Sequence, residues 1–547
     1  MSRPIPFVSA WLKRRGRRRL RGMMRGYRVM RATGRLDWFT EIGEAMTNTP
    51  FRRIESGAAR MIFGAAVDRA ETCARQYALI RVTRFTMNQS LLLSLGTGRA
   101  PVVHPLPAEW RAILEQQGFK VAKVRSAVAW QGYVFLLWGF GVLTIARRVF
   151  ANLSAWRRSS NDAPGLGRYA FFDRLTADNL PRPYADGRSY DILTWYEQWP
   201  GRARVLDTIC HGVAGARPTA VNGIAARSVA SALPPLERVG LQLRFLAWGI
   251  AATFLAAADA LRGRWWHALL LAEASSAATA RLLEPGRLAQ DYLFHIVGSL
   301  YRPLWTYEAE RRGSRIILYN YSTNIETFKR PDGYHTQANS WQAITWPVIL
   351  VWDEGQADFY RRAAGDHADI QIVGPIGFTA SDKEMPPLSL PAVAVFDVQP
   401  VRDSLYQMLG LPDEFHTPKT VNQFLLDVHA AVSDAGGVML LKRKRKVGRL
   451  AHPLYVAVVN RLAGAPGFME IEPEIPSGRV IEHCQAVIAM PFSSPALQGR
   501  AMGKPSIYYD PHGSVQLDDR AGHGMTIVGG HAELARWVAA HIHSKPA

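Results

Sequence analysis

From Ala392 to Asp510 the chain alternates short apolar runs with longer segments of helical periodicity. The strand-like runs are AVAVFDV, VMLLKRKRKV, GFMEIEPE, QAVIAMPFSS and PSIYYD. A helix-like segment separates each run from the next, which predicts an α/β fold with a parallel sheet between helices. Ligands of such sheets bind at the carboxyl ends of the strands, so the alternation also predicts where a site would lie.

A second alternating region precedes the first, from about Tyr169 to Phe378. Its expected strands are Tyr190–Gln198, RPTAVNG, Ser314–Ser322, the start of Trp346–Ala363 and Ala368–Phe378, and its expected helices include RARVLDTICHGV and AQDYLFHIVGSLYRPLWTYEAERRG. A polar segment with three prolines, Thr379–Pro391, has the composition of a linker. We therefore predict a basic segment at 1–68, a Rossmann-like domain at 69–378, the linker at 379–391 and a second Rossmann-like domain at 392–547.

The net charge of +21 is concentrated at the start of the chain. Residues 1–36 contain twelve Lys and Arg and no acidic residue, interleaved with apolar residues such as Trp11, Met23 and Met30. This pattern is typical of an amphipathic segment on an anionic membrane surface. A disordered basic tail is one alternative, and nucleic-acid binding is a less favoured one.

The three cysteines, Cys73, Cys210 and Cys484, lie far apart with no paired spacing. This distribution favours a reducing compartment and predicts neither a metal site nor a disulfide framework.

Two apolar stretches strengthen the membrane interpretation. Ser126–Ala146 has 21 residues without a charge, enough at ~1.5 Å per residue to cross a hydrocarbon core of ~30 Å. Both of its flanks are basic, so the positive-inside rule places both ends in the cytoplasm and favours a re-entrant or in-plane helix over a single span. The second stretch, near 236–283, has a shorter charge-free run and predicts a helical hairpin. We expect a protein at the cytoplasmic face of the inner membrane, with a buried core helix as the alternative for 126–146.

The run AVIAMPFSSPALQGRAMGKPSIYYD, from Ala486 to Asp510, ends an expected strand on Ser493 and Ser494 just before a helix. Free backbone N–H groups and the positive end of the helix dipole would point outward there. Pro495 suits the first helical turn, and two small hydroxyls add donors without blocking a phosphate. The pattern predicts a phosphate site, and simple capping of the helix by Ser494 is the alternative.

The stretch from VMLLKRKRK to PSIYYD resembles the C-terminal domain of GT-B glycosyltransferases that make bacterial capsule and surface polysaccharides, a pattern shared by polyol-phosphate transferases of the teichoic-acid type. WPVILVWDEGQADFYRRAAGDHADIQIVGPIGF is similar to the segment that closes the N-terminal domain in that group, and ILTWYEQWPGRARVLDTICHG to one of its N-domain motifs. The resemblance covers residues 340–510. It implies two Rossmann-like domains of GT-B type, here with N-terminal helical membrane-associated elements.

The same resemblance implies that Ser493, Ser494 and the following helix hold the diphosphate of a nucleotide donor. Gln498 stands where the family has a ribose-binding Glu, and LKRKRKV (Leu441–Val447) replaces its Lys-Pro-His-Pro motif. Lys442 or Lys444 can supply positive charge for the phosphates, and a solvated basic edge strand is the alternative. The expected binding residues are Ser493, Ser494, Gln498, Lys442, Lys444, Glu474, Gly374 and Gly377.

The acceptor side needs a carboxylate or His within hydrogen-bond reach of the acceptor hydroxyl. Glu197, in WYEQWPGR, is the first candidate because it comes just after an expected strand, and a surface-loop acid is the alternative. Asp353 and Glu354 in VWDEG, near the domain junction, are rival catalytic candidates, as is Asp191. Tyr319–Asn324 ends another strand with groups that can stack on and bond a sugar.

These residues predict a membrane-associated glycosyltransferase that moves a sugar from a nucleotide-sugar donor to a growing surface polysaccharide or lipid-linked glycan, without a cofactor or a metal. The alternatives are a polyol-phosphate transferase of the same fold, a non-catalytic GT-B-like membrane assembly protein and a sugar-nucleotide epimerase. The expected partners are the nucleotide-sugar, the lipid-linked or polysaccharide acceptor and the anionic membrane surface. Nucleic acid is not favoured.

Overall fold

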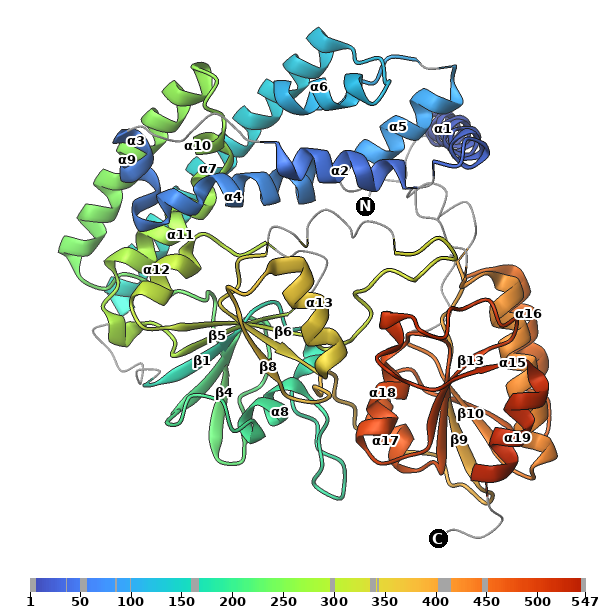
Figure 1. Cartoon of the computed structure of the whole chain (residues 1–547). Helices are drawn as coiled ribbons and strands as arrows, with labels where there is room; N and C mark the ends of the chain where they lie inside the picture. The colour runs from blue at the N-terminus through green and yellow to red at the C-terminus, as the bar shows by residue number, and fades with distance from the viewer. Residues whose placement is uncertain are drawn as a thin grey trace.

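The computed structural model describes residues 6–35, 37–49, 57–83, 86–98, 100–158, 167–295, 301–334, 341, 344–401, 415–444 and 451–542. These residues form a mainly helical N-terminal part, an eight-stranded sheet and a six-stranded sheet (Figure 1). The architecture is mixed α/β with parallel sheets, as the alternation predicts. The exact domain boundaries stay predictions.

The six-stranded sheet has the strand order β11-β10-β9-β12-β13-β14, and all its neighbouring strands are parallel. Its strands are β9 (Ala392–Phe396), β10 (Val438–Lys442), β11 (Phe468–Ile471), β12 (Ala486–Ala489), β13 (Ser506–Asp510) and β14 (Ile527–Gly529). Its helices are α15 (Pro418–Asp434), α16 (Pro453–Leu462), α17 (Ser477–Glu482), α18 (Ser494–Ala501) and α19 (His531–His541). The strands expected from Ala392 to Asp510 are all confirmed.

The eight-stranded sheet has the order β3-β4-β2-β1-β5-β6-β7-β8 and is parallel except for the antiparallel pair β3–β4. Its strands are β1 (Tyr169–Phe172), β2 (Thr208–His211), β3 (Thr219–Val221), β4 (Ile224–Ser228), β5 (Asp291–His295), β6 (Arg315–Tyr319), β7 (Val348–Val351) and β8 (Asp369–Ile372).

Parts of this region differ from the prediction. YDILTWYEQ, expected as a strand, contains the helix α8 (Ile192–Gln198), because the Asp191 carboxylate accepts the N–H groups of Leu193 and Thr194 and so starts a helix. β2 and β5 both lie inside segments that were expected to be helical. Short apolar runs fit either structure by periodicity alone, and pairing with β1 decides in favour of strands here.

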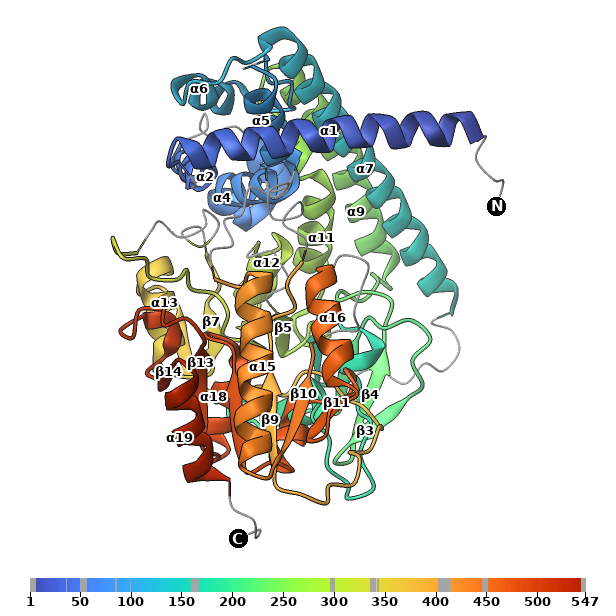
Figure 2. The ribbon, with the colours of Figure 1, turned by 90° about the vertical axis from the view of Figure 1, so that its right-hand side faces the viewer.

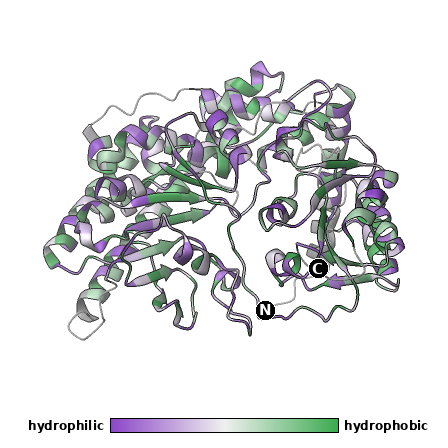
Figure 3. Cartoon of the chain, turned by 60° about the horizontal axis from the view of Figure 1, so that its bottom comes forward, coloured by the Kyte–Doolittle hydropathy of each residue, from purple (hydrophilic) through white to green (hydrophobic). Residues whose placement is uncertain are grey.

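Both faces of the eight-stranded sheet are covered by apolar side chains. On one face, residues such as Phe171 and Tyr292 pack with α10 (Trp266–Leu269), α11 (Leu271–Leu282), α12 (Trp305–Arg311) and α13 (Glu354–Ala364). On the other face, Phe172 and Leu293 share a cluster with Leu440 of the six-stranded sheet. Hydrophobic residues accordingly concentrate on the strands (Figure 3). Cover on both sides is what a parallel sheet requires.

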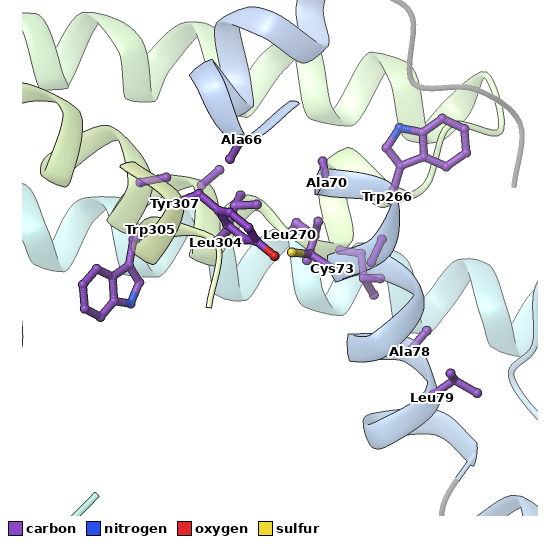
Figure 4. Close-up of a cluster of buried hydrophobic side chains, with 14 of the residues drawn as sticks. Ala66, Ala70, Cys73, Ala78, Leu79, Trp266, Leu270, Leu304, Trp305 and Tyr307 are labelled. Carbon is purple, nitrogen blue, oxygen red and sulfur yellow. The ribbon is translucent and has the colours of Figure 1, made fainter. Parts of the chain in front are cut away.

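The N-terminal helices continue the core of the eight-stranded sheet. They are α1 (Pro6–Ala32), α2 (Trp38–Asn48), α3 (Gly57–Phe63), α4 (Val67–Ala78), α5 (Thr86–Gly96), α6 (Ala108–Gln116), α7 (Lys123–Arg158) and α9 (Val239–Leu261). Cys73 of α4 packs among Leu270, Leu304 and Tyr307, which come from the helices over the sheet (Figure 4). All three cysteines are buried and free of disulfides.

The predicted membrane segments are helical. α7 includes 126–146, and α9, α10 and α11 together occupy the expected hairpin region. α7 and α9 are long and apolar enough to cross a membrane, judged by length and composition, and only 22% of the apolar window of each is buried. A core helix of a soluble protein meets the same length and composition criterion.

α1 carries exposed arginines, but the apolar side of its second half is not free. Met23 and Met30 are buried in the protein core. A Cβ atom on Gly26 would lie 1.9 Å from the backbone oxygen of Leu92 in α5, and one on Gly96 would lie 1.9 Å from the oxygen of Gly22. Glycines thus allow α1 and α5 to touch backbone to backbone. The expectation that Met23 and Met30 face a membrane is wrong, and the side chain of Trp11 lies outside the described residues.

We predict that Gly26→Ala destabilises the protein by about 1–3 kcal/mol, because the added methyl group must push two helices apart. Gly16→Ala is the matched control in the same helix, since a Cβ there meets nothing within 4 Å. It should stabilise the helix by about 0.5–1 kcal/mol. Denaturant unfolding of the three proteins measures both effects, and equal stability of the two variants would contradict the close contact.

Candidate functional site

The junction between β12 and α18 has the predicted form. α18 begins at Ser494, with Pro495 in its first turn. Phe492 turns the chain with a φ of 64°, in the left-handed region, which is costly for a bulky residue and is retained mainly where the surroundings require it. Ser493 and Ser494 are buried at the carboxyl end of the sheet.

The two serine hydroxyls have different partners. Ser493 Oγ donates to the Met490 carbonyl at 2.7 Å and so closes the turn. Ser494 Oγ donates to Asn324 Oδ1 at 2.6 Å and accepts the N–H of Thr323 at 2.9 Å. Neither hydroxyl caps α18, so the capping explanation is wrong. Ser494 instead joins the six-stranded sheet to the loop after β6.

Lys442 brings a positive charge to the carboxyl end of β10. Its Nζ donates to the carbonyls of Arg443 and Pro473, each at 2.9 Å. Burial lowers the pKa of Lys442 to about 8, so most of it is still protonated at pH 7. β10 is separated from β12 only by β9, so this charge lies on the same edge as the serines.

Three other predicted binding residues lie around this edge. The Gln498 amide oxygen accepts the Ser477 hydroxyl at 2.6 Å and links α18 to α17. The Glu474 carboxylate lies 3.5 Å from Lys383 of the linker segment. Lys444 is exposed, and Arg445–Val447 lies outside the described residues. Their roles in donor binding stay predictions.

Asp397 is not among the residues predicted from the sequence, although an acid directly after the run AVAVF was visible there. It follows β9, at the centre of the carboxyl edge. Its Oδ2 accepts the Tyr455 hydroxyl at 2.5 Å, while Oδ1 is buried without a hydrogen-bond partner among the described residues. Burial raises the pKa of Asp397 to about 6. A buried carboxylate oxygen without a partner is costly, and such groups cluster at binding sites.

Glu197 does not follow a strand. It lies in the last turn of α8, where its carboxylate accepts Asn222 Nδ2 at 2.5 Å and lies 3.6 Å from Arg202. Asn222 sits in the turn that leads into β4, which is the amino-terminal edge of the parallel strands. Ligands bind at the opposite edge. The prediction that Glu197 directly follows a strand, which made it the first catalytic candidate, is therefore wrong.

Asp353 connects the parts of the chain that contain the two sheets. Its Oδ1 accepts the Gln356 N–H at 3.0 Å and lies 2.6 Å from His523 Nδ1, while Oδ2 lies 3.6 Å from Arg500. Burial alone would raise the pKa of Asp353, but the contacts with His523, Gln356 and Arg500 together lower it. A carboxylate held in its ionised form is a poor proton acceptor. The contacts favour a structural role, and a catalytic one stays a prediction.

The remaining predicted residues have local contacts. Glu354 is exposed and forms an ion pair within its own helix, with an N···O distance of 2.5 Å. Gly374 has a φ of 75°, which favours glycine. A Cβ on Gly377 would lie 2.5 Å from the carbonyl oxygen of Tyr190. The two glycines shape the chain after β8, and their role in donor binding stays a prediction.

A second polar cluster lies at the carboxyl ends of β5 and β6. His295 ends β5, and its ring centroid lies 5.8 Å from Tyr319, 5.8 Å from Tyr321 and 5.1 Å from Phe378. Tyr321 stacks on Phe378 at 4.2 Å with an interplanar angle of 12°. The segment Tyr319–Asn324 thus ends its strand with aromatic groups, as expected, but His295 lies in a segment that the sequence suggested was helical.

His295 Nδ1 and the Tyr319 hydroxyl are buried without hydrogen-bond partners in the described part of the chain. Burial lowers the pKa of His295 to about 4, so the imidazole is neutral at pH 7. Its Nε2 lies 3.4 Å from the Arg174 carbonyl. With the ring proton on that nitrogen, Nδ1 is left as an acceptor.

The carboxyl edges of the two sheets come together at the loop after β6. Thr323 and Asn324, which bind Ser494, belong to the same loop as Tyr321. One loop therefore connects the histidine cluster of the eight-stranded sheet to the serine turn of the six-stranded sheet. Across the described ranges, no group of three His, Cys, Asp or Glu side chains is placed to hold a metal ion.

We predict that Asp397 makes stability depend on pH. Because its pKa is raised in the folded state, the folded protein binds the extra proton, and this contribution is fully present below about pH 4 and is lost as pH rises through 6. The loss is about 2–3 kcal/mol. Asp397→Asn should remove this part of the pH profile and be at least as stable as wild type at pH 7. Denaturant unfolding across this range checks the prediction, and parallel profiles would contradict the raised pKa of the buried carboxyl group.

Comparisons with solved structures give low scores. Matches include a variant of the wall teichoic acid polymerase TagF, with 11% identity and a TM-score of 0.36 over 75% of this chain and 88% of that chain. Another is the glycosyltransferase SnogD from Streptomyces nogalater, with 13% identity and a TM-score of 0.30 over 69% of this chain and 95% of that chain. No curated protein matches the sequence.

The family comparison is more informative. A model described as polysaccharide biosynthesis PFTS motif protein matches residues 248–538, more than half of the chain. The matched region includes β5 to β8 and the whole six-stranded sheet, and with them His295, Asp397 and the serine pair. The chain belongs to the polysaccharide biosynthesis PFTS motif family.

Proposed function

We propose that this chain is a membrane-associated GT-B glycosyltransferase, which moves a sugar from a nucleotide-activated donor to a growing polysaccharide or lipid-linked glycan. The observation that carries the proposal is the contact of Ser494 with Thr323 and Asn324, which joins the carboxyl ends of β12 and β6. Family membership supports a role in polysaccharide biosynthesis. The donor, the acceptor and the place of action belong to the proposal.

In this proposal the six-stranded sheet binds the donor diphosphate. The start of α18 has no side-chain cap, so its N–H groups and the positive end of its dipole can face an anion. Lys442 adds a charge on the same edge, and Asp397 Oδ1, which has no hydrogen-bond partner among the described residues, can accept a donor hydroxyl. Negative charge grows on the departing diphosphate, and Lys442 and α18 stabilise it.

The eight-stranded sheet supplies the acceptor side. Tyr321 and Phe378 offer aromatic faces for a sugar ring. His295 Nδ1 accepts the proton of the acceptor hydroxyl as that oxygen bonds to the anomeric carbon and the bond from this carbon to the diphosphate breaks. An imidazole with a pKa of about 4 is a weak base. The proton therefore transfers to His295 in the same step in which the diphosphate leaves, not in an earlier step.

We predict that His295→Ala lowers the turnover rate on the order of 10²–10⁴-fold with donor affinity retained. His211→Ala is the matched control, because His211 is also buried at the carboxyl end of a strand, yet its Nδ1 already accepts the N–H of Val213 at 3.3 Å. The measurement is nucleotide release from a panel of nucleotide sugars and nucleotide-activated polyol phosphates, with extracted membrane glycolipids as acceptors.

The released nucleotide separates the alternatives. Sugar transfer from a nucleotide sugar releases a nucleoside diphosphate, whereas transfer of an activated polyol phosphate releases a nucleoside monophosphate. Donor binding without turnover across the panel would favour a non-catalytic assembly protein. Equal turnover in His295→Ala and wild type would show that His295 is not the proton acceptor.

We predict that Ser493→Ala/Ser494→Ala weakens binding of a nucleoside diphosphate by about 1–3 kcal/mol, because each hydroxyl turns from its protein acceptor to a phosphate oxygen when the nucleotide binds. Thr323→Val is the matched control, because it removes the hydroxyl bond of Thr323 to Ser494 (3.1 Å) and leaves both serines in place. Calorimetric titration gives the affinities, and thermal melts show that the fold survives. Unchanged affinity in the double variant, or an equal loss in Thr323→Val, would contradict phosphate binding by the serines.

A further inference from the structure

α7 and α9 expose a row of large apolar side chains on their outer sides. Leu136, Phe140 and Leu143 come from α7, and Leu246, Ile250 and Phe254 come from α9. Leu136 is 67% exposed and Phe254 is 70% exposed. Their spacing of three or four residues places each set on one side of its helix. We call these six residues the α7/α9 face.

The two helices pack side by side and antiparallel, so both rows lie on the outside of one helix pair. Trp138 Nε1 donates to the Thr253 carbonyl at 3.0 Å, and a Cβ on Gly249 would lie 2.7 Å from Ile145. Residue numbers thus rise along α7 as they fall along α9. Figure 2 shows the pair at the outer side of the helical part.

The opposite side of the same helices is protein interior and contains polar groups. Arg148 of α7 donates to Ser276 of α11 at 2.7 Å. Asp259 of α9 is buried, with His267 Nδ1 at 2.6 Å. A pair that crossed a bilayer would take these groups and α11 into hydrocarbon, at high cost. A one-sided apolar face fits a pair that lies in the plane of a membrane.

The exposed charges around the face are basic. α7 contains no acidic residue, and Asp259, the single acid of α9, is buried. Arg147 and Arg244 are exposed near one end of the paired helices, and Arg125 and Arg262 near the other. Anionic lipid headgroups would pair with these arginines, whereas a second copy of the chain would oppose them with like charges.

We propose that the α7/α9 face lies in the plane of an anionic phospholipid bilayer and is buried at the boundary between headgroups and acyl chains. This placement does not depend on the proposed transferase activity. It deepens the membrane association expected from the sequence, because it assigns the contact to six named residues and gives both helices an orientation parallel to the surface. α1 contributes arginines but not the apolar contact of Met23 and Met30, which are buried.

The first test is flotation of the full chain with vesicles of phosphatidylethanolamine and phosphatidylglycerol. Leu246→Gln/Ile250→Gln/Phe254→Gln should weaken binding on the order of tenfold or more, since three apolar side chains leave the membrane. Leu390→Gln/Leu454→Gln/Leu517→Gln is the matched control, with residues that are 50%, 62% and 77% exposed on other parts of the molecule. It should bind as wild type does. Unchanged flotation of the first variant would overturn the proposal.

The second test measures orientation. The three native cysteines are buried, so a fluorophore attached to Leu246→Cys, Ile250→Cys or Phe254→Cys reports that position. Quenching by lipids brominated at different depths should place all three labels at one shallow depth. Depths that change steadily along α9 would show a crossing helix. A wild-type dimer that the triple glutamine variant converts to a monomer, without vesicle binding by either, would assign the face to a second copy.

Discussion

The hydrogen bonds of Ser494 to Thr323 and Asn324 bring together two sheet edges that the chain builds far apart in sequence. Parallel strands place their carboxyl ends on one edge, so each sheet offers a single row of polar residues. The Ser494 contact places these two rows next to each other. His295 and Tyr321 lie on one side of it, and Asp397 and Lys442 lie on the other. A transferase needs that arrangement, because donor and acceptor must meet while each is held by its own groups.

The helical N-terminal part is explained by the need of a parallel sheet for apolar cover on both faces. One face of the eight-stranded sheet shares an apolar cluster with residues of α8, α17 and α18, and the other face buries its side chains under α10 to α13. α7 and α9 pack on the outside of this layer, where Gly141 lets α7 approach Leu271 of α11. Their remaining apolar side is left exposed by the described part of the chain, which is the basis for assigning it to lipid.

The sequence predicted the six-stranded sheet well because its strand and helix periods alternate clearly and Pro495 marks the start of α18. It predicted the strand, turn and helix around Ser493 but not the partner of Ser494, since Asn324 lies 170 residues away. The position of Glu197 was predicted wrongly and His295 was not identified for a related reason. Which edge a residue occupies depends on strand pairing, and both residues lie in segments whose short apolar runs fit helix and strand alike. The burial of Asp397 likewise depends on Tyr455 and neighbouring strands.

The most direct measurement of the central claim is hydrogen exchange with and without a bound nucleoside diphosphate. If the two edges form one site, amides in 319–324 and in 490–498 become protected together when the ligand binds, because the loop after β6 and the serine turn share the Ser494 contact. Protection of 490–498 alone would contradict the claim, since it would mean that the six-stranded sheet binds the ligand without the facing edge.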